Sequence, residues 1–215
     1  MCIEFKVVLS LLHFNELLVQ HITMSASSPI ALVFGAGNNV GAGVVKAFSA
    51  KGYRIATVSR TAKADTSDKR LHIQADLADP ESVSTVFGTV RKQLGHPSVV
   101  IYNGSLLGLF VATVSMLTKT GAAASFVNKD DPLEVSLKDA IRDMNINTFS
   151  ALAAAKEAVK SFEALSKDAA RTFIFTGNIM NFQAIPVLMS AGMGKSATAH
   201  MIQTAAQVYA ARGYR

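Results

Sequence analysis

The stretch IALVFGAGNNVGAG, from Ile30 to Gly43, decides the fold. Its first five residues form a short apolar run that fits a buried strand, and a glycine-rich turn follows them. A helical pattern then runs over 44–51 and ends at Gly52. In such a strand–turn–helix unit, free backbone N–H groups and the helix dipole favour a bound diphosphate. Glycine lets the diphosphate approach the backbone closely.

Extended and helical patterns alternate along the rest of the chain, which is typical of an α/β fold with a parallel sheet. Further strands are predicted at 54–58, 71–75, 99–102 and 172–176. Helices are predicted from Asp79 (the N-cap) and Pro80 to Leu94, within 128–171 with Ser136 as a cap, and at 191–211. We expect one domain over 29–215 with a Rossmann-type, doubly wound parallel sheet in a three-layer αβα arrangement.

The composition argues against several functions. The 215 residues are 50% hydrophobic and 17% charged, as in a well-buried globular chain. The net charge of +6 suits an anionic cofactor, but Lys and Arg are scattered, so no nucleic-acid partner is expected. A single cysteine, Cys2, excludes an internal disulfide. The five histidines lack the spacing of metal ligands, so no metal site is expected.

Two segments do not fit the alternating pattern. Residues 1–28 are interpreted as a poorly ordered N-terminal extension, in which Met24 fits a natural start. Its apolar run at 7–12 is too short to span a bilayer, so a membrane partner is not expected and the protein is expected in the cytoplasm, although a targeting role stays open. The second segment, 106–124, is apolar without a clear period and is interpreted as an insertion.

The spacing of the glycines is Gly37-xxx-Gly41-x-Gly43, and not GxGxxG. It resembles the TGxxxGxG loop of the short-chain dehydrogenase/reductase family, with Ala36 in place of Thr. The context of the loop, between a predicted strand and a predicted helix, is the one that a dinucleotide requires. The loop residues expected to bind the cofactor are Gly35, Gly37, Asn38, Asn39, Val40, Gly41 and Gly43.

The end of the second strand indicates which dinucleotide is bound. An acidic residue there would bind the adenosine ribose of NAD and repel a 2′-phosphate. Ser59 takes that place and Arg60 follows it. Because a guanidinium offers a planar fork that suits a phosphate, NADP(H) is favoured over NAD(H).

The resemblance extends over most of residues 29–212. Asp76, followed by Leu77, resembles the family's Asp that contacts the adenine. Tyr102-Asn103-Gly104-Ser105 resembles its NNAG motif, altered at most positions but with Asn103 in register. Asn147 matches the catalytic Asn, with Ser150 where the family usually has Gly. Lys195 matches the Lys that holds the nicotinamide ribose. The resemblance therefore implies Asn147, Asn178 and Lys195 as catalytic residues, with Asn178 at the position of the family's Ser.

The sequence departs from the family in its chemistry. Reduction of a carbonyl leaves an alkoxide that needs a proton donor, which the family supplies as a Tyr four residues before the Lys. That position holds Ala191. The glycines around Lys195 also suggest a P-loop, but Met189 stands where that pattern needs Gly, so we reject it. The family also continues beyond the position of Arg215, so a C-terminal truncation is expected.

Three hypotheses follow. The chain is an NADP(H)-dependent oxidoreductase acting on a small carbonyl or alcohol, a catalytically inactive dinucleotide-binding sensor or scaffold, or a truncated inactive product. A homodimer is the expected assembly, through the helices within 136–165 and 191–211, where the small residues Ala151, Ala153, Ala154 and Ala155 would allow close approach.

Overall fold

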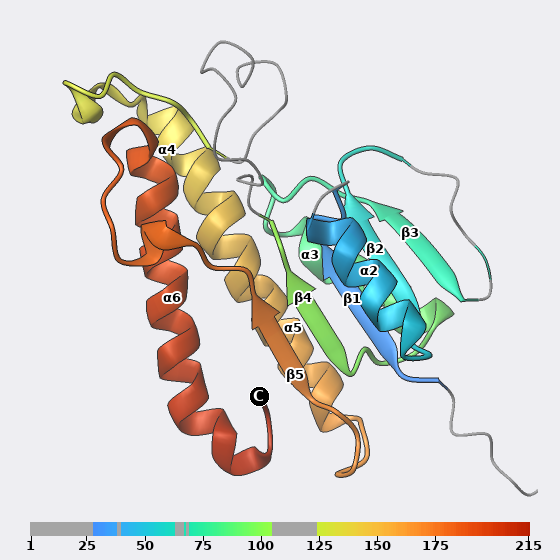
Figure 1. Ribbon diagram of the computed structural model, residues 1–215. Helices are drawn as coiled ribbons and strands as arrows, with labels where there is room; N and C mark the ends of the chain where they lie inside the picture. The colour runs from blue at the N-terminus through green and yellow to red at the C-terminus, as the bar shows by residue number, and fades with distance from the viewer. Residues whose placement is uncertain (1–27, 38–39, 63–66, 68, 105–123) are drawn as a thin grey trace, which may run out of the picture.

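A computed structural model describes residues 28–37, 40–62, 67, 69–104 and 124–215. Its centre is a five-stranded parallel sheet in the order β3-β2-β1-β4-β5 (Figure 1). The strands are β1 (Ile30–Phe34), β2 (Arg54–Ser59), β3 (Arg70–Gln74), β4 (Val99–Tyr102) and β5 (Thr172–Phe175). The strand order reverses between β1 and β4, which is where open α/β sheets bind their ligands.

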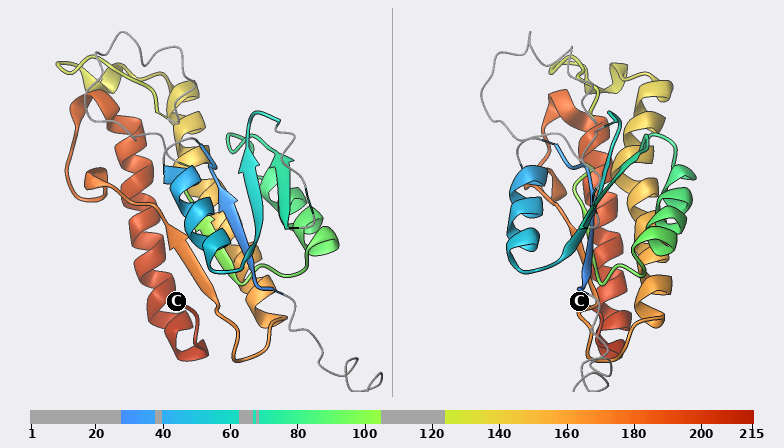
Figure 2. Two further views of the ribbon diagram at one scale, coloured as in Figure 1. Left: turned by 45° about the vertical axis from the view of Figure 1, so that its right-hand side comes forward. Right: turned by 90° about the vertical axis from the view of Figure 1, so that its right-hand side faces the viewer.

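Helices cover both faces of the sheet. Alternate residues of β1 pack against α3 (Ser82–Gln93) and α5 (Ser150–Glu163), and the intervening residues pack against α2 (Val40–Ala50). Because β1 is buried on both faces, its sequence is continuously apolar. Figure 2 shows α2 on one side of the sheet and α3 on the other. The expected doubly wound, three-layer αβα fold is confirmed.

A long helical segment leads into α5. It consists of α4 (Leu137–Met144), a five-residue π-helical turn, η3 (Asn145–Phe149), and α5 itself. In the π turn, the Ser150 N–H donates to the carbonyl oxygen of Asn145, five residues back. The last long helix, α6 (Met189–Tyr209), runs beside this segment and contacts α4, η3 and α5 (Figure 1).

Short turns of 3-10 helix join these elements. They are η2 (Pro132–Glu134), η4 (Ile179–Asn181), η5 (Pro186–Leu188) and η6 (Ala210–Arg212). After η6, Gly213 adopts a left-handed conformation with a φ of 73° and turns the chain back toward the sheet. The Arg215 N–H donates to the carbonyl oxygen of Arg171 at 2.9 Å, and the Phe173 N–H donates to that of Arg215 at 2.7 Å. The last residues therefore pair with the outer edge of β5.

The starts of α2, α3 and α6 differ from the prediction, and α6 begins at Met189, two residues earlier than expected. Helix α3 begins at Ser82, because Asp79 and Pro80 lie in a turn, in which the Asp79 carboxylate accepts from the Glu81 N–H at 3.1 Å. Helix α2 begins at Val40, four residues earlier than expected, because its two glycines do not interrupt the helix. The predicted cap of α4 is confirmed, since the Ser136 Oγ accepts from the Asp139 N–H at 3.1 Å.

The remaining expectations concern the two unusual segments, the alanines expected at a dimer contact, and membrane spans and metal sites. Residues 1–27 and 105–123, which hold nearly all of the predicted extension and insertion, lie outside the described residues. Ala151 and Ala154 are buried against the sheet, so their small side chains serve the core and offer no surface to a second chain. Over the described ranges, no helix is long and apolar enough to cross a membrane, and no group of three metal-binding side chains is present.

Candidate cofactor and active site

The turn after β1 is shaped by glycine. Gly35 has a φ of 74°, and a Cβ at this position would lie 2.1 Å from the carbonyl oxygen of Asn103. The side-chain amide of Asn103 donates to the carbonyl oxygen of Gly35 at 3.0 Å, which fixes the turn against the end of β4. A Cβ at Gly41 would lie 2.7 Å from the same Gly35 oxygen, so helix α2 approaches the strand as closely as glycine allows.

The other two glycines of the loop face open space. A Cβ at Gly37 or Gly43 would meet no atom within 4 Å. Val40, the first residue of α2, is 47% exposed, so the start of the helix is open as well. These features fit a diphosphate, which needs a close backbone and the N-terminus of a helix. Asn38 and Asn39 lie outside the described residues, so their predicted contacts are not placed.

The segment after β2 presents a guanidinium to solvent. Arg60 is exposed, and its side chain makes no hydrogen bond or ion pair with the residues that the structure describes. Ser59 lies beside it, and its Oγ donates to the carbonyl oxygen of Thr61 at 2.9 Å. The Ser59 hydroxyl is therefore partly used within the loop, whereas the charge of Arg60 remains available.

The segment after β3 is attached to the π turn and to the start of α5. The Ser150 Oγ donates to the carbonyl oxygen of Leu77 at 2.7 Å, and the Asn145 Nδ2 donates to that of Ala78 at 2.9 Å. The Asp76 carboxylate accepts from the Ala78 N–H at 3.0 Å and is otherwise exposed. The sequence therefore indicated the residues of this segment but not the groups that hold them.

Gly104, directly after β4, is constrained by the preceding strand, because a Cβ there would lie 2.6 Å from the ring of Tyr102.

Lys195 is the buried cation of this region. Only 1% of it is exposed, its Nζ donates to the carbonyl oxygen of Thr176 at 2.9 Å, and the same atom lies 4.5 Å from the centre of the Phe175 ring. Burial lowers the pKa of Lys195 to about 8. The side chain therefore points to the carboxyl end of β5, where the Asn178 segment begins.

Asn147 packs directly against the helix that carries Lys195. A Cβ at Gly194 would lie 2.7 Å from the Asn147 Cβ, so the absence of a side chain at Gly194 lets α6 pack closely against Asn147. The Asn147 Nδ2 donates to the carbonyl oxygen of Asp143 at 2.9 Å, and the Thr198 Oγ1 donates to the Asn147 carbonyl oxygen at 2.6 Å. Asn147 is 1% exposed, and these contacts fix the π turn against α6.

Asn178 begins the short helix η4. Its Oδ1 accepts from the Met180 N–H at 3.0 Å, while its own N–H donates to the Asn181 Oδ1 at 3.4 Å. The two asparagines form a capping box. The cap uses the side-chain oxygen of Asn178 and leaves its Nδ2 donor without a hydrogen bond to the described part of the chain.

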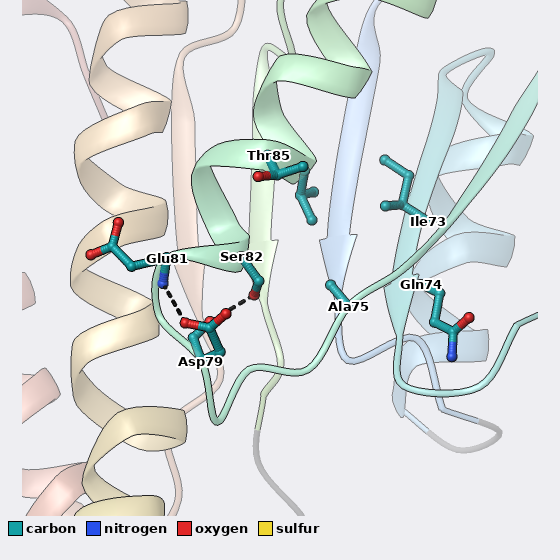
Figure 3. A pocket seen from close by; sticks show the side chains of 8 residues that line it. Ile73, Gln74, Ala75, Asp79, Glu81, Ser82 and Thr85 are labelled. Carbon is teal, nitrogen blue, oxygen red and sulfur yellow. Dashed lines mark hydrogen bonds between the residues drawn. The ribbon is translucent and has the colours of Figure 1, made fainter.

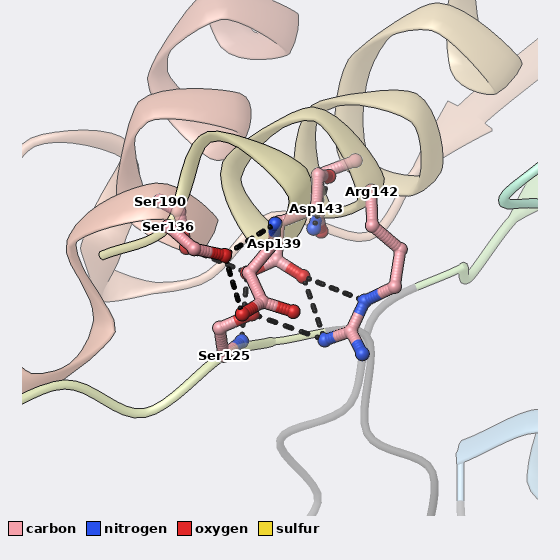
Figure 4. Close-up of polar contacts among 7 residues, drawn as sticks. Ser125, Ser136, Asp139, Arg142, Asp143 and Ser190 are labelled. Atoms are coloured by element: carbon pink, nitrogen blue, oxygen red, sulfur yellow. Dashed lines mark hydrogen bonds and ion pairs between the residues drawn. The ribbon is translucent and has the colours of Figure 1, made fainter.

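A buried carboxylate next to this region was not predicted from the sequence. Asp143 has no exposed surface, and its Oδ2 accepts from the Ser190 Oγ at 2.6 Å and from the Ser125 N–H at 2.7 Å (Figure 4). The Arg142 Nη2 donates to its other oxygen at 3.0 Å and to the Ser125 Oγ at 3.1 Å. This group ties the start of α6, one residue before Ala191, to the end of α4. Its members are far apart in sequence, so no local pattern indicated it.

A separate hollow of about 330 Å³ lies between the end of β3 and the start of α3 (Figure 3). Its walls combine apolar and polar side chains: Ile73, Gln74, Ala75, Asp79, Glu81, Ser82, Thr85 and Val86. None of the residues predicted to bind the cofactor lines it, so it is distinct from the glycine loop.

Comparisons with known proteins match this arrangement. A family model described as short chain dehydrogenase matches residues 29–215. The chain belongs to the short-chain dehydrogenase/reductase family. A curated short chain dehydrogenase/reductase from Cryptosporiopsis sp. is 48% identical over 189 residues, which cover 88% of this chain and 74% of that protein.

Solved structures of several reductases and dehydrogenases share the fold at low identity. A 3-oxoacyl-[acyl-carrier protein] reductase from Brucella melitensis superposes with a TM-score of 0.69 at 17% identity, covering 88% of this chain and 73% of that one. Aldohexose dehydrogenase from Thermoplasma acidophilum gives 0.67 at 18%, covering 85% of this chain and 62% of that one. A 4-hydroxyisoleucine dehydrogenase complexed with NADH gives 0.68 at 15%, covering 87% and 72%.

Within this short-chain dehydrogenase/reductase, the predicted site residues fall into two groups. The residues after β1, β2, β3 and β4 gather at the carboxyl edge of the sheet, as expected for a dinucleotide. Lys195 and Asn178 lie after β5. Ala191, at the position that the spacing assigns to the family's Tyr, is 2% exposed and packs with Met180 and Leu188. The neighbouring Ser190 hydroxyl is occupied by Asp143.

Proposed function

We propose that the chain binds NADP(H) and acts as an oxidoreductase on a small carbonyl or alcohol. The observation that carries the proposal is the glycine turn, where a Cβ would collide at Gly35 and Gly41 but meet nothing at Gly37. Such a turn accepts a diphosphate at the start of α2. Arg60, exposed at the end of β2, would bind the 2′-phosphate, and Asp76 with Leu77 would contact the adenine.

The residues after β5 would hold the reacting groups. Lys195 would orient the nicotinamide ribose through its Nζ, and the Nδ2 of Asn178 would donate a hydrogen bond to the substrate oxygen. When bound, the nicotinamide supplies or accepts a hydride. The substrate oxygen then needs a proton, which Lys195 Nζ can release through a water, because its pKa of about 8 lies close to neutral pH.

The second candidate is a dinucleotide-binding sensor or scaffold without catalysis. One observation favours it. At the position of the family's Tyr, Ala191 packs in an apolar cluster, and the hydroxyl of the preceding residue, Ser190, donates to Asp143. In that case the fold would bind the cofactor and report its presence, and Lys195 would contribute only to binding.

The first experiment is a fluorescence titration of the purified chain with NADPH and with NADH, together with Arg60→Leu as the matched variant. We expect NADPH to bind about 10- to 100-fold more tightly than NADH, because a charge-assisted phosphate contact is lost with NADH. Arg60→Leu should remove this preference. Equal binding of both cofactors by the unaltered chain would contradict the proposal of NADP(H).

Catalysis is tested separately, by oxidation of NADPH in the presence of a panel of small aldehydes and ketones. Turnover that falls in Lys195→Met would support the enzyme. Tight NADPH binding without turnover on any member of the panel would favour the sensor or scaffold.

A further inference from the structure

Two side chains of β3 hold the backbone that carries Arg60. The Gln74 Nε2 donates to the carbonyl oxygen of Arg60 at 2.8 Å. The His72 Nε2 lies 2.9 Å from the carbonyl oxygen of Thr61. The Ser59 Oγ also donates to the Thr61 oxygen. The carbonyl oxygens of Arg60 and Thr61 are therefore both bound by side chains of β3, from two residues that lie on the same face of the strand.

The register of the sheet explains how this is possible. Thr57 lies opposite His72, and Ser59 lies opposite Gln74, so alternate residues of β3 point to the same face at the end of β2. The Ser59 carbonyl oxygen still pairs with the Ala75 N–H at 3.1 Å, and the parallel ladder between β2 and β3 ends there. The two β3 side chains take over at this point.

One ring hydrogen of His72 is placed by its partners. A carbonyl oxygen only accepts, so the Nε2 that faces Thr61 must carry a hydrogen. The Nδ1 lies 2.9 Å from the Thr57 Oγ1, and that hydroxyl also lies 3.3 Å from the Leu71 carbonyl oxygen. The ring is therefore held at both nitrogens, one to the strand and one to the loop.

We propose that His72 and Gln74 are positioning residues for the 2′-phosphate of NADP(H). By binding the carbonyl oxygens of Arg60 and Thr61, they fix the backbone from which the Arg60 guanidinium extends, and so set the preference for NADP(H) over NAD(H). This inference rests on the proposed function, because it requires that Arg60 binds the phosphate. The side chains touch no part of the cofactor and act through Arg60.

The physical reason is pre-organisation. The Arg60 side chain is exposed and makes no hydrogen bond or ion pair within the described part of the chain, so only the position of its backbone restricts it. Ordering a free loop at the moment of binding costs conformational entropy, which reduces affinity. A loop that the sheet already holds avoids this cost. The benefit goes only to NADP(H), because only its 2′-phosphate would bind Arg60.

The experiment measures NADPH and NADH dissociation constants by fluorescence titration for His72→Leu, Gln74→Leu and the double variant. Each single change should weaken NADPH binding about 3- to 10-fold, the usual effect of one lost hydrogen bond, and change NADH binding less than about 2-fold. His72→Gln should restore much of the affinity, because its Nε2 can reach the same carbonyl oxygen. Thr89→Ala removes a comparable side-chain to backbone bond on α3 and should change neither constant.

The decisive comparison uses Arg60→Leu as the background. If His72 and Gln74 act through Arg60, then His72→Leu added to Arg60→Leu should weaken NADPH binding no further. An equal loss of NADPH and NADH affinity, or a further loss in the Arg60→Leu background, would overturn the inference. If Arg60→Leu weakens NADPH binding but the β3 variants do not, only this inference fails. If Arg60→Leu itself changes nothing, the proposed NADP(H) function fails with it.

Discussion

The side-chain amide of Asn103 donates to the carbonyl oxygen of Gly35 across 3.0 Å, and so joins the ends of β4 and β1 at the point where the strand order reverses. The contact allows no side chain at Gly35, because a Cβ would lie 2.1 Å from the Asn103 carbonyl oxygen. The turn that we assign to the diphosphate is therefore fixed before any ligand arrives.

This geometry predicts opposite effects for two glycines of one motif. Gly35→Ala should lower the free energy of unfolding by about 3 kcal/mol or more, because it combines a positive φ with a steric collision. Gly43→Ala lies within α2, meets no neighbour and should raise it by about 0.5–1 kcal/mol. Urea denaturation of both variants measures this. A mild effect of Gly35→Ala would show that the turn can rearrange.

The burial of Lys195 predicts a loss of folding stability that depends on pH. Its folded-state pKa of about 8 lies below its ordinary value of 10.5, so the unfolded chain binds more protons between these values and stability rises with pH in this window. Lys195→Met should therefore be about 2 kcal/mol more stable than the wild type at pH 7. The advantage should vanish near pH 11, where only the lost hydrogen bond to Thr176 remains. A pH-independent difference in denaturation midpoints would contradict this.

Asp143 predicts a large loss of stability from a small change. Asp143→Asn replaces one acceptor oxygen by a donor, in a buried site where Ser190, Ser125 and Arg142 all donate. We expect a loss of about 2–4 kcal/mol, measured by thermal or urea unfolding. Ser190→Ala, which removes one donor and leaves the charge pair, should cost only about 1 kcal/mol. Equal losses in the two variants would show that the charge of Asp143 is unimportant.

The ion pairs of Glu157 predict how folding stability changes at acidic pH. Burial raises the pKa of this carboxyl, but the hydrogen bonds and charges of Lys160 and Arg91 outweigh it, so the net pKa is lowered. Its stabilising contribution is then present above the unfolded-state pKa and is lost as the pH falls through the folded-state value. Glu157→Gln should be about 1 kcal/mol less stable at pH 7, with the gap closing below about pH 4. A constant gap down to low pH would refute this.

Much of the fold was predictable because it depends on local patterns. The prediction placed β1 and β4 at their observed bounds, since both strands are short apolar runs bounded by turn residues. The start of α3 was wrong by two residues, because Asp79 and Pro80 are as well suited to a turn as to a helix start. The first turn of α2 was missed because it contains Gly41 and Gly43, and glycine is unfavourable within a helix.

The site was predictable only in part. The glycine loop and Lys195 carry spacing that the sequence displays directly. The contacts that hold them do not: Asp143 meets Ser190 across 47 positions, and Gln74 meets the Arg60 backbone across 14. Such contacts depend on strand register and helix packing, which no single-sequence pattern encodes.

The π turn between α4 and α5 has a consequence for deletions. It contains one residue more than a regular α-helical turn, and each residue turns a helix by about 100°. Loss of any one residue within 145–149 would let the segment close into a continuous α-helix. Because the wider π turn already absorbs the extra residue, the helices on either side would keep nearly the same rotation about the axis, and the Asp143 carboxylate would still face its partners on α6. Loss of one residue from the regular turns of α5 would instead rotate α4 and the π turn by about 100° relative to the rest of α5, so a deletion should be tolerated better within the π turn than beside it.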